Sequence, residues 1–287
     1  MKSPFLKGLV AVVATGTTAT GGFFAWKHAT KPTDIKSRLI WEGLTIADVN
    51  RKGVWGAIYL AKKDVSGFSD FVAASDKATA ATQLKQKCSE LFGISASDKN
   101  FEESYKMAQK WCLKPDLTTI EMQFEFEDRE FASGDDDFKN LFALNKGTSG
   151  FVEAVKTVVS GFTDKTELET AKGNVQSWCN AMKSKTPEGD NLRNAVSWCS
   201  KPESNFKSFM EKKGFRFLLD GEWGSKATSL KSKNGDSALD NDIKSESGND
   251  DGSKLKSWCD KKKVDSAQIH TLSSDLGKIE SRCFVRK

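Results

Sequence analysis

The stretch Trp-Cys-Leu-Lys-Pro at 111–115 recurs as Trp-Cys-Ser-Lys-Pro at 198–202, and another Lys-Pro pair stands at 31–32. Self-similarity at a fixed period is typical of chains built from copies of one supersecondary unit. Aligning the Lys-Pro pairs predicts three tandem units of about 85 residues, at 31–113, 114–200 and 201–287. This period is long for a solenoid, so successive small domains and helical modules packed end to end both remain open.

Each unit carries two cysteines near its end, and these six are all the cysteines of the chain. Six thiols allow 15 connectivities. Repeat symmetry favours one of them, which pairs Cys88 with Cys112, Cys179 with Cys199, and Cys259 with Cys283. Disulfides of this kind are typical of an oxidising exterior and stabilise small modules by roughly 2 to 4 kcal/mol each. The alternative is six buried thiols beside tryptophans at helix interfaces.

The N-terminal residues 1–30 contain an uncharged stretch from Gly8 to Trp26, with lysines on both sides. Nineteen such residues are just long enough to cross a bilayer as a helix. No Ala-x-Ala cleavage site follows a short apolar core, so an uncleaved transmembrane anchor over 8–26 is favoured over a removed signal peptide or a buried core helix. The flanking charges do not set the orientation. The cysteines favour an extracellular location for the bulk of the chain.

The remaining chain is predicted to be mainly α-helical with short β segments. Apolar residues recur at spacings of three and four, which is the helical period. The longest helical candidates are 68–91, 100–112, 149–161 and 166–182. Thr33 or Asp34 is placed to cap a short first helix that Gly43 ends. The stretch 120–126 is ambiguous, because its alternating pattern favours a strand whereas its place in the repeat favours a helix.

The third unit contains a stretch of different composition at 224–254. It is rich in Ser, Gly, Lys and acidic residues, with only scattered Ala, Leu and Ile. This low-complexity insertion predicts a mobile loop or linker within 201–287. The tryptophans of the four Trp-Cys pairs, in contrast, are expected in the core, because an indole buries a large apolar area. They are Trp111, Trp178, Trp198 and Trp258.

No residue of the chain is predicted to be catalytic, to bind a cofactor or to ligate a metal, and the protein is not expected to be an enzyme. The sequence lacks a Walker loop, a dinucleotide fingerprint, G-x-S-x-G and H-E-x-x-H, and its two histidines are His28 and His270. The clusters Asp135–Asp137 and Asp250–Asp251 lack the ligand spacing of a calcium loop and are read as solvated turns. Lys261–Lys263 is read as an exposed face that an acidic glycan or lipid would attract.

The formal charge of +5 comes from 44 basic and 39 acidic residues interspersed along the chain. This describes a mixed soluble surface and gives no reason to expect a nucleic-acid partner. The 19 Phe and 8 Trp residues are enough to build packed cores.

Several stretches resemble the paralogous families of uncharacterised membrane-anchored proteins of haemotropic mycoplasmas. They are the apolar start at 1–22, I-K-S-R-L-I-W-E-G-L at 35–44, W-G-A-I-Y-L at 55–60, and the Trp-Cys pairs. The resemblance covers most of the chain, although each motif is loose. It implies a single-pass protein of the cell membrane, displayed at the surface and antigenic, with no established activity and no catalytic residues to carry over.

The leading functional hypothesis is therefore a surface antigen or host-interaction module. It would be held in the lipid bilayer through 8–26 and would contact a host surface or plasma protein. The alternative is a structural, envelope-organising protein that associates with itself through its repeats. An enzymatic function would need carboxylates from different units to converge, and no spacing selects a pair.

Overall fold

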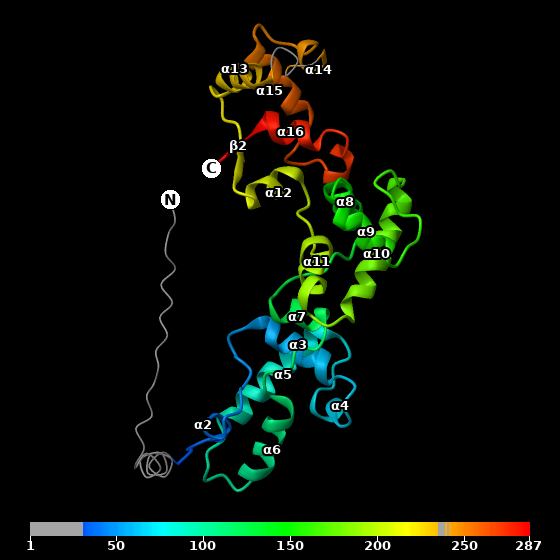
Figure 1. Ribbon diagram of the computed structural model, residues 1–287. Helices are drawn as coiled ribbons and strands as arrows, with labels where there is room; N and C mark the ends of the chain where they lie inside the picture. The colour runs from blue at the N-terminus through cyan, green and yellow to red at the C-terminus, as the bar shows by residue number, and fades with distance from the viewer. Residues whose placement is uncertain (1–30, 235–238, 240) are drawn as a thin grey trace, which may run out of the picture. The chain divides into compact units, whose positions relative to one another are not determined.

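The computed structural model describes residues 31–234, 239 and 241–287 (Figure 1). Within them the protein is mainly helical, as predicted, and two three-residue strands pair antiparallel. The predicted membrane anchor at 8–26 lies outside the described residues. None of the helices in the described ranges has the length and apolarity needed to cross a membrane. The chain divides into two compact units, one with residues 31–50 and 62–114 and the other with 51–61 and 115–287.

The first unit is a helical hairpin with two shorter helices packed beside it. Its elements are α2 (Ile35–Trp41), α4 (Phe68–Phe71), α5 (Lys77–Phe92) and α6 (Phe101–Trp111). Helices α5 and α6 lie side by side, and α2 contacts both. Trp111 on α6 meets Phe68 edge-on at 5.6 Å and stacks on Phe71 at 5.9 Å between ring centroids. These buried rings and the α5–α6 pair form a core close to the end of the unit.

The second unit contains two hydrophobic cores. The first lies among α7 (Ile120–Phe126), α8 (Asp135–Asn145), α9 (Ser149–Lys156), α10 (Leu168–Lys183) and α11 (Gly189–Cys199). Helix α8 packs along α10, and α7 contacts both α10 and α11. The stretch 120–126, which the sequence left ambiguous, is thus a helix. Thr119 caps it by accepting a hydrogen bond from the Met122 N–H at 3.2 Å.

Helix α3 (Lys52–Lys62) packs against α7 through its glycines. A Cβ atom at Gly53 would stand 2.0 Å from the carbonyl oxygen of Glu125, and one at Gly56 would stand 2.1 Å from the Glu125 side chain. Arg51 also lies over the ring of Phe126 at 4.0 Å. Only glycine permits this approach of a helix backbone. Residues 51–61 therefore belong to the second unit, although the alignment of Lys-Pro pairs places them in the stretch 31–113.

The second core of this unit lies within residues 201–287. Its elements are α12 (Phe206–Lys212), β1 (Phe215–Phe217), α13 (Trp223–Asn234), α14 (Asn241–Lys244), α15 (Asp251–Lys261), the 3₁₀ helix η2 (Ile269–Leu272), α16 (Leu276–Cys283) and β2 (Phe284–Arg286). Strands β1 and β2 pair antiparallel, with Arg216 opposite Val285. Leu144 of α8 packs against this core as well, which joins the two cores of the unit.

The prediction of a mobile loop or linker over 224–254 is wrong for its described residues. Most of them lie in α13, α14 and the start of α15. Ala227, Leu239 and Ile243 are buried in the core. The composition is polar because the helices expose most of their surface, yet the few apolar residues are the ones that face inward. Asp250 caps α15 by accepting a hydrogen bond from the Ser253 N–H at 2.7 Å.

One local arrangement occurs three times with the same residue spacing, and we call it the closing frame. Each copy starts with a capping residue and a seven-residue helix, at Asp34 with α2, Thr119 with α7 and Asn205 with α12. Nine positions after the cap stands a residue with positive φ, at Gly43 (82°), Asp128 (55°) and Gly214 (84°). Four positions further, a backbone N–H donates to the carbonyl of a cysteine, from Ala47 to Cys112, Ala132 to Cys199 and Leu218 to Cys283, at 3.0, 2.8 and 3.0 Å.

Candidate functional site

The six cysteines form three disulfides, and the pairing is the one that repeat symmetry favours. The bridges are Cys88–Cys112, Cys179–Cys199 and Cys259–Cys283, with Cα–Cα distances of 5.5, 5.5 and 5.8 Å. These separations are within the normal range for a disulfide. All six side chains are buried. The carbonyl of the second cysteine in each bridge also accepts the hydrogen bond of a closing frame. Each disulfide therefore links a frame to the helix that carries the first cysteine.

The tryptophans of the Trp-Cys pairs lie in or against the cores, as expected. Trp111, Trp178 and Trp258 are buried, and Trp198 is half-buried against Trp178 at 5.9 Å and Phe151 at 5.6 Å. Their role is packing in the cores, because burying an indole removes a large apolar area from water.

The acidic clusters act at helix ends. Asp137 accepts hydrogen bonds from the backbone N–H groups of Ser133 and Gly134 at 3.0 and 3.2 Å, and Asp135 pairs with Lys172 at 2.7 Å. Backbone hydrogen bonds from Ser253 lower the pKa of Asp250, the cap of α15. Carboxylates at helix N-termini are favoured by the helix dipole. Within the described residues, no group of three or more His, Cys, Asp or Glu side chains is placed to hold a metal ion.

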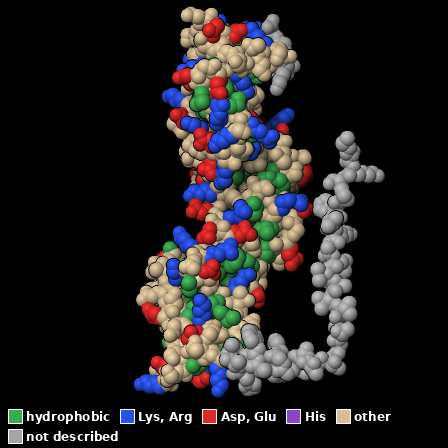
Figure 2. Space-filling model, turned by 90° about the vertical axis from the view of Figure 1, so that its left-hand side faces the viewer, with side chains coloured by type: hydrophobic (Ala, Val, Ile, Leu, Met, Phe, Trp, Pro, Cys, Tyr) green, Lys and Arg blue, Asp and Glu red, His purple; other side chains and the backbone are tan. Residues whose placement is uncertain are grey.

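Two lysines of the Lys261–Lys263 run form ion pairs within the fold. Lys261 pairs with Glu246 at 2.5 Å, and Lys262 pairs with Asp275 at 2.7 Å while lying 4.7 Å from the ring of Trp258. Lys263 has a φ of 50° at the turn after α15. Two of the three charges are therefore neutralised locally, and the run is not a continuous basic patch. Over the face drawn in Figure 2, basic and acidic side chains are likewise interspersed.

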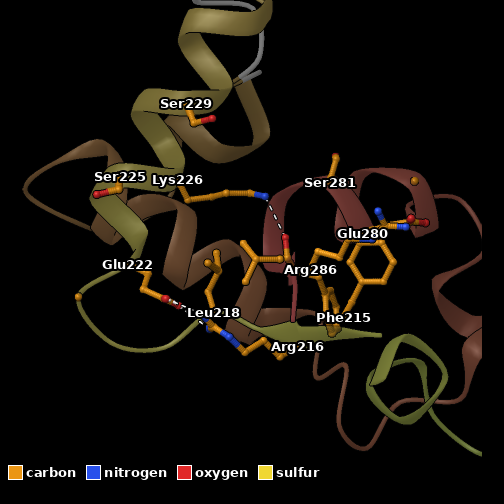
Figure 3. A pocket seen from close by; sticks show the side chains of 14 residues that line it. Phe215, Arg216, Leu218, Glu222, Ser225, Lys226, Ser229, Glu280, Ser281 and Arg286 are labelled. Atoms are coloured by element: carbon orange, nitrogen blue, oxygen red, sulfur yellow. Dashed lines mark hydrogen bonds and ion pairs between the residues drawn. The ribbon is translucent and has the colours of Figure 1, made fainter. Parts of the chain in front are cut away.

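The strongest candidate site is a groove beside the β1–β2 pair (Figure 3). Its volume is about 860 Å³, and α13 and α16 form its walls. The lining residues are Phe215, Arg216, Leu218, Gly221, Glu222, Ser225, Lys226, Ser229, Gly277, Glu280, Ser281, Phe284, Val285 and Arg286. Eight of these fourteen residues are polar or charged, and the apolar ones besides the two glycines are Phe215, Leu218, Phe284 and Val285.

Paired charges order one side of the groove. Nη1 and Nη2 of Arg216 both donate to Glu222, at 2.7 and 2.6 Å, and the Leu219 N–H donates to the same carboxylate at 2.8 Å. The Arg216 guanidinium, together with this backbone N–H, lowers the pKa of Glu222 to about 2. Across the groove, Lys226 Nζ donates to the Phe284 carbonyl at 2.9 Å, as Figure 3 shows. Bidentate pairing makes the Arg216 side of the site rigid.

This arrangement suits binding better than acid–base chemistry. A general acid at neutral pH needs a raised pKa, whereas Glu222 is held ionised. The residues that line the groove include neither cysteine nor histidine. The serines at 225, 229 and 281 and the exposed Arg286 offer hydrogen bonds and charge to a bound molecule. Sequence reasoning missed this groove, because no sequence signal pairs Phe215–Phe217 with Phe284–Arg286, which lie about 70 residues further along the chain.

His270 links α8 to η2. Its backbone N–H and its ring Nδ1 both meet Asn140 Oδ1, at 2.9 and 3.0 Å, and Asn140 Nδ2 donates to Gln268 at 3.3 Å. Asn140 is buried, and burial also lowers the pKa of His270. His270 therefore forms a polar contact between the two cores of the second unit. His28 lies outside the described residues.

Comparisons with known proteins give no relative. No protein-family model, no curated protein and no solved structure matches the chain.

Proposed function

We propose that this protein is a membrane-anchored surface protein whose disulfide-bonded helical part lies outside the cell and binds a host surface or plasma component, as an antigen or interaction module. The observation that carries the proposal is the pairing of all six cysteines in three buried bridges. Structural disulfides persist in oxidising surroundings and are rare in the cytosol. The uncharged stretch 8–26 supplies the anchor.

We also propose that the chain consists of three tandem copies of one module. The support is the closing frame, whose cap, positive-φ residue and hydrogen bond to a cysteine keep the same spacing in all three places. The Lys-Pro pairs stand three to five residues before the caps. Each module would then bury its own disulfide and present its exposed helix surfaces to a partner.

The groove beside β1 and β2 supports a binding function rather than an enzymatic one. Its lining combines the Arg216–Glu222 ion pair, serines and Arg286 with a few apolar side chains. Such a surface recognises a mixed polar and apolar segment of a host protein. The protein acts by contact and needs no cofactor.

The first test is peptide mass mapping of the native protein after its free thiols have been alkylated without reduction. Three bridges and no alkylated cysteine are expected. Treatment of intact cells with a protease that cannot cross the membrane should then degrade the region 31–287. Six alkylated thiols together with a protected 31–287 would instead indicate an inward-facing protein, and the surface function would be rejected.

The second test separates host binding from self-association. Binding of the full chain to plasma proteins and host cells is compared for the wild type, for Arg286→Glu in the groove and for Lys165→Glu as a matched exposed control. Loss of binding only in Arg286→Glu supports the groove as the contact. Chemical cross-linking that yields ordered oligomers without any host adduct would favour the envelope-organising alternative.

A further inference from the structure

We propose that the groove beside β1 and β2 binds a folded turn of the host partner, and that this turn presents a carboxylate side chain. The proposal rests on the host-binding function proposed above. It adds the shape and the charge of the segment that the groove accepts.

The helix that borders the groove has two counterparts that already contact folded protein. Helices α3, α8 and α13 start 18, 16 and 18 positions after the caps of the three closing frames. Each of the first two lies against a later segment of the chain. Arg51, directly before α3, lies over the ring of Phe126 on α7 at 4.0 Å, and α8 contacts η2. The corresponding side of α13 borders the groove, so a folded segment is the kind of occupant that suits it.

The contact between α8 and η2 indicates the shape of such a segment. Asn140 on α8 and Lys226 on α13 both stand 21 positions after a cap. Asn140 Oδ1 accepts the backbone N–H of His270 at 2.9 Å, and Asn140 Nδ2 donates to Gln268 at 3.3 Å. Gln268 is the residue at which the 3₁₀ helix η2 begins to turn. This side of α8 therefore binds a tight turn, and the equivalent side of α13 offers a similar surface.

The strand edge beside the groove disfavours an extended occupant. Within the β1–β2 pair the Leu218 N–H donates to the Cys283 carbonyl at 3.0 Å. The carbonyl of Phe284, one residue later, therefore points away from β1. It accepts a hydrogen bond from Lys226 at 2.9 Å, as Figure 3 shows. A lysine at a strand edge hinders the addition of another strand, so a turn is favoured over an extended peptide.

The side chains of the lining select the charge of the turn. Lys226 and Arg286 can donate hydrogen bonds but cannot accept them. Arg216 and Glu222 neutralise each other as an ion pair. Of the other charged residues in the lining, Lys226 and Arg286 are basic and Glu280 is acidic, which leaves an excess of positive charge. Arg286 is exposed at the end of β2, and a carboxylate would supply it with both acceptor oxygens and the opposite charge.

The test is selection of phage-displayed peptides on the full chain, solubilised in detergent with its disulfides intact. One library displays random loops closed by a disulfide, and the other displays random linear peptides of the same length. The selected peptides are synthesised, and calorimetry measures their affinity for the wild type, for Arg286→Glu and for Lys165→Glu. Lys165 is exposed in the turn before α10 and does not line the groove, so it is the matched control. Unchanged cysteine pairing shows that each variant has folded.

Disulfide-closed peptides that share an aspartate or glutamate are the expected result. Arg286→Glu should weaken their binding by at least about tenfold, whereas Lys165→Glu should leave it unchanged. Selection of linear peptides alone, of peptides without an acid, of peptides that bind Arg286→Glu equally well, or of no peptide would each overturn the proposal. Self-association of the chain in sedimentation velocity that the selected peptide abolishes would also overturn it, because the occupant would then be a second copy.

Protease treatment of intact cells separates a failure of this inference from a failure of the proposed function. If 31–287 is degraded but no acidic turn is selected, the surface location stands and the acidic turn is wrong. If acidic turns are selected but 31–287 stays protected, the groove keeps its preference and a host protein is rejected as the partner.

Discussion

The closing frames keep the same spacing in all three copies, whereas the stretches inside them differ from one copy to the next. The three frames share a cap, a seven-residue helix, a positive-φ residue and a hydrogen bond to a cysteine carbonyl. The helices inside each frame differ more, chiefly in length. The short helix has four residues in α4 and α14 but eight in α9, and the next has 16 residues in α5 and α10 but 11 in α15.

The difference shows where the sequence is constrained. The hydrogen bond of a frame joins residues 65 to 67 positions apart, and the spacing from the cap to the positive-φ residue and to the N–H donor is the same in all three copies. The helices inside the frame need only an apolar face that fits the core. Cores tolerate varied apolar residues when volume and pattern are kept. Four experiments test this division, from the largest expected effect to the smallest.

Removing a disulfide should have the largest effect, and a similar one in every frame. Replacing Cys179 and Cys199 together by alanine is expected to lower the free energy of unfolding by about 3 to 4 kcal/mol. The sequence separations of the three pairs are 24, 20 and 24 residues. Such loop lengths change the closure entropy by only ~0.2 kcal/mol. Guanidinium denaturation of the solubilised chain, followed by circular dichroism, measures the three double variants. A pair whose removal is neutral would show that its frame is not equivalent to the others.

A truncation inside the variable stretch of the third segment should be nearly as costly. Ile243 on α14 is 1% exposed and belongs to the core, so Ile243→Ala is expected to destabilise by about 3 kcal/mol. Leu219→Ala is the matched control, because Leu219 is 60% exposed and its truncation should change stability by less than about 0.5 kcal/mol. The same denaturation experiment compares them. If both variants changed the free energy of unfolding by an equal, negligible amount, the prediction of a linker over 224–254 would be restored.

The sequence predicted the helical class and the cysteine pairs because both follow from positions that recur. It left α7 ambiguous for a physical reason. Helix α7 contacts α10, α11 and α3 and is thus covered on more than one side. Ile120, Met122 and Phe124 are therefore all buried, which produces the alternation of a strand in a helix.

The prediction for the stretch 224–254 failed for the opposite reason. Its helices bury few side chains each, so its average composition resembles that of a disordered segment. The groove was out of reach of sequence reasoning as well. Its walls come from α13 and α16 and its floor from β1 and β2, which lie up to about 70 residues apart in the chain. Only the folded chain places these side chains around one space.

The positive-φ position offers a third, smaller test of the frame. Gly214→Ala is expected to destabilise by about 1 kcal/mol, because a Cβ in the left-handed region is strained even where, as here, no atom lies within 4 Å. Asp128→Gly should relieve the same strain in the second frame and stabilise. Gly173→Ala in α10 is the control of opposite sign, since its site is open and helical, and alanine there should stabilise by about 0.5 to 1 kcal/mol. Thermal denaturation ranks the three variants by stability. A Gly214→Ala variant as stable as the unchanged chain would contradict strain at this turn.

The smallest effect is expected outside the frames, at the contact between α8 and η2. Burial lowers the pKa of His270 in the folded chain, whereas the unfolded chain keeps the ordinary value near 6.5. Between these values the unfolded state binds the proton more tightly, so the free energy of unfolding should fall as the pH drops from 7.5 to 5.5. One proton gives a slope of at most about 1.4 kcal/mol per pH unit. In His270→Gln this slope should disappear, while the three disulfides stay intact by mass mapping. A slope unchanged in the variant would mean that another group titrates, because Asn140 and Gln268, the partners of this contact, carry no charge of their own.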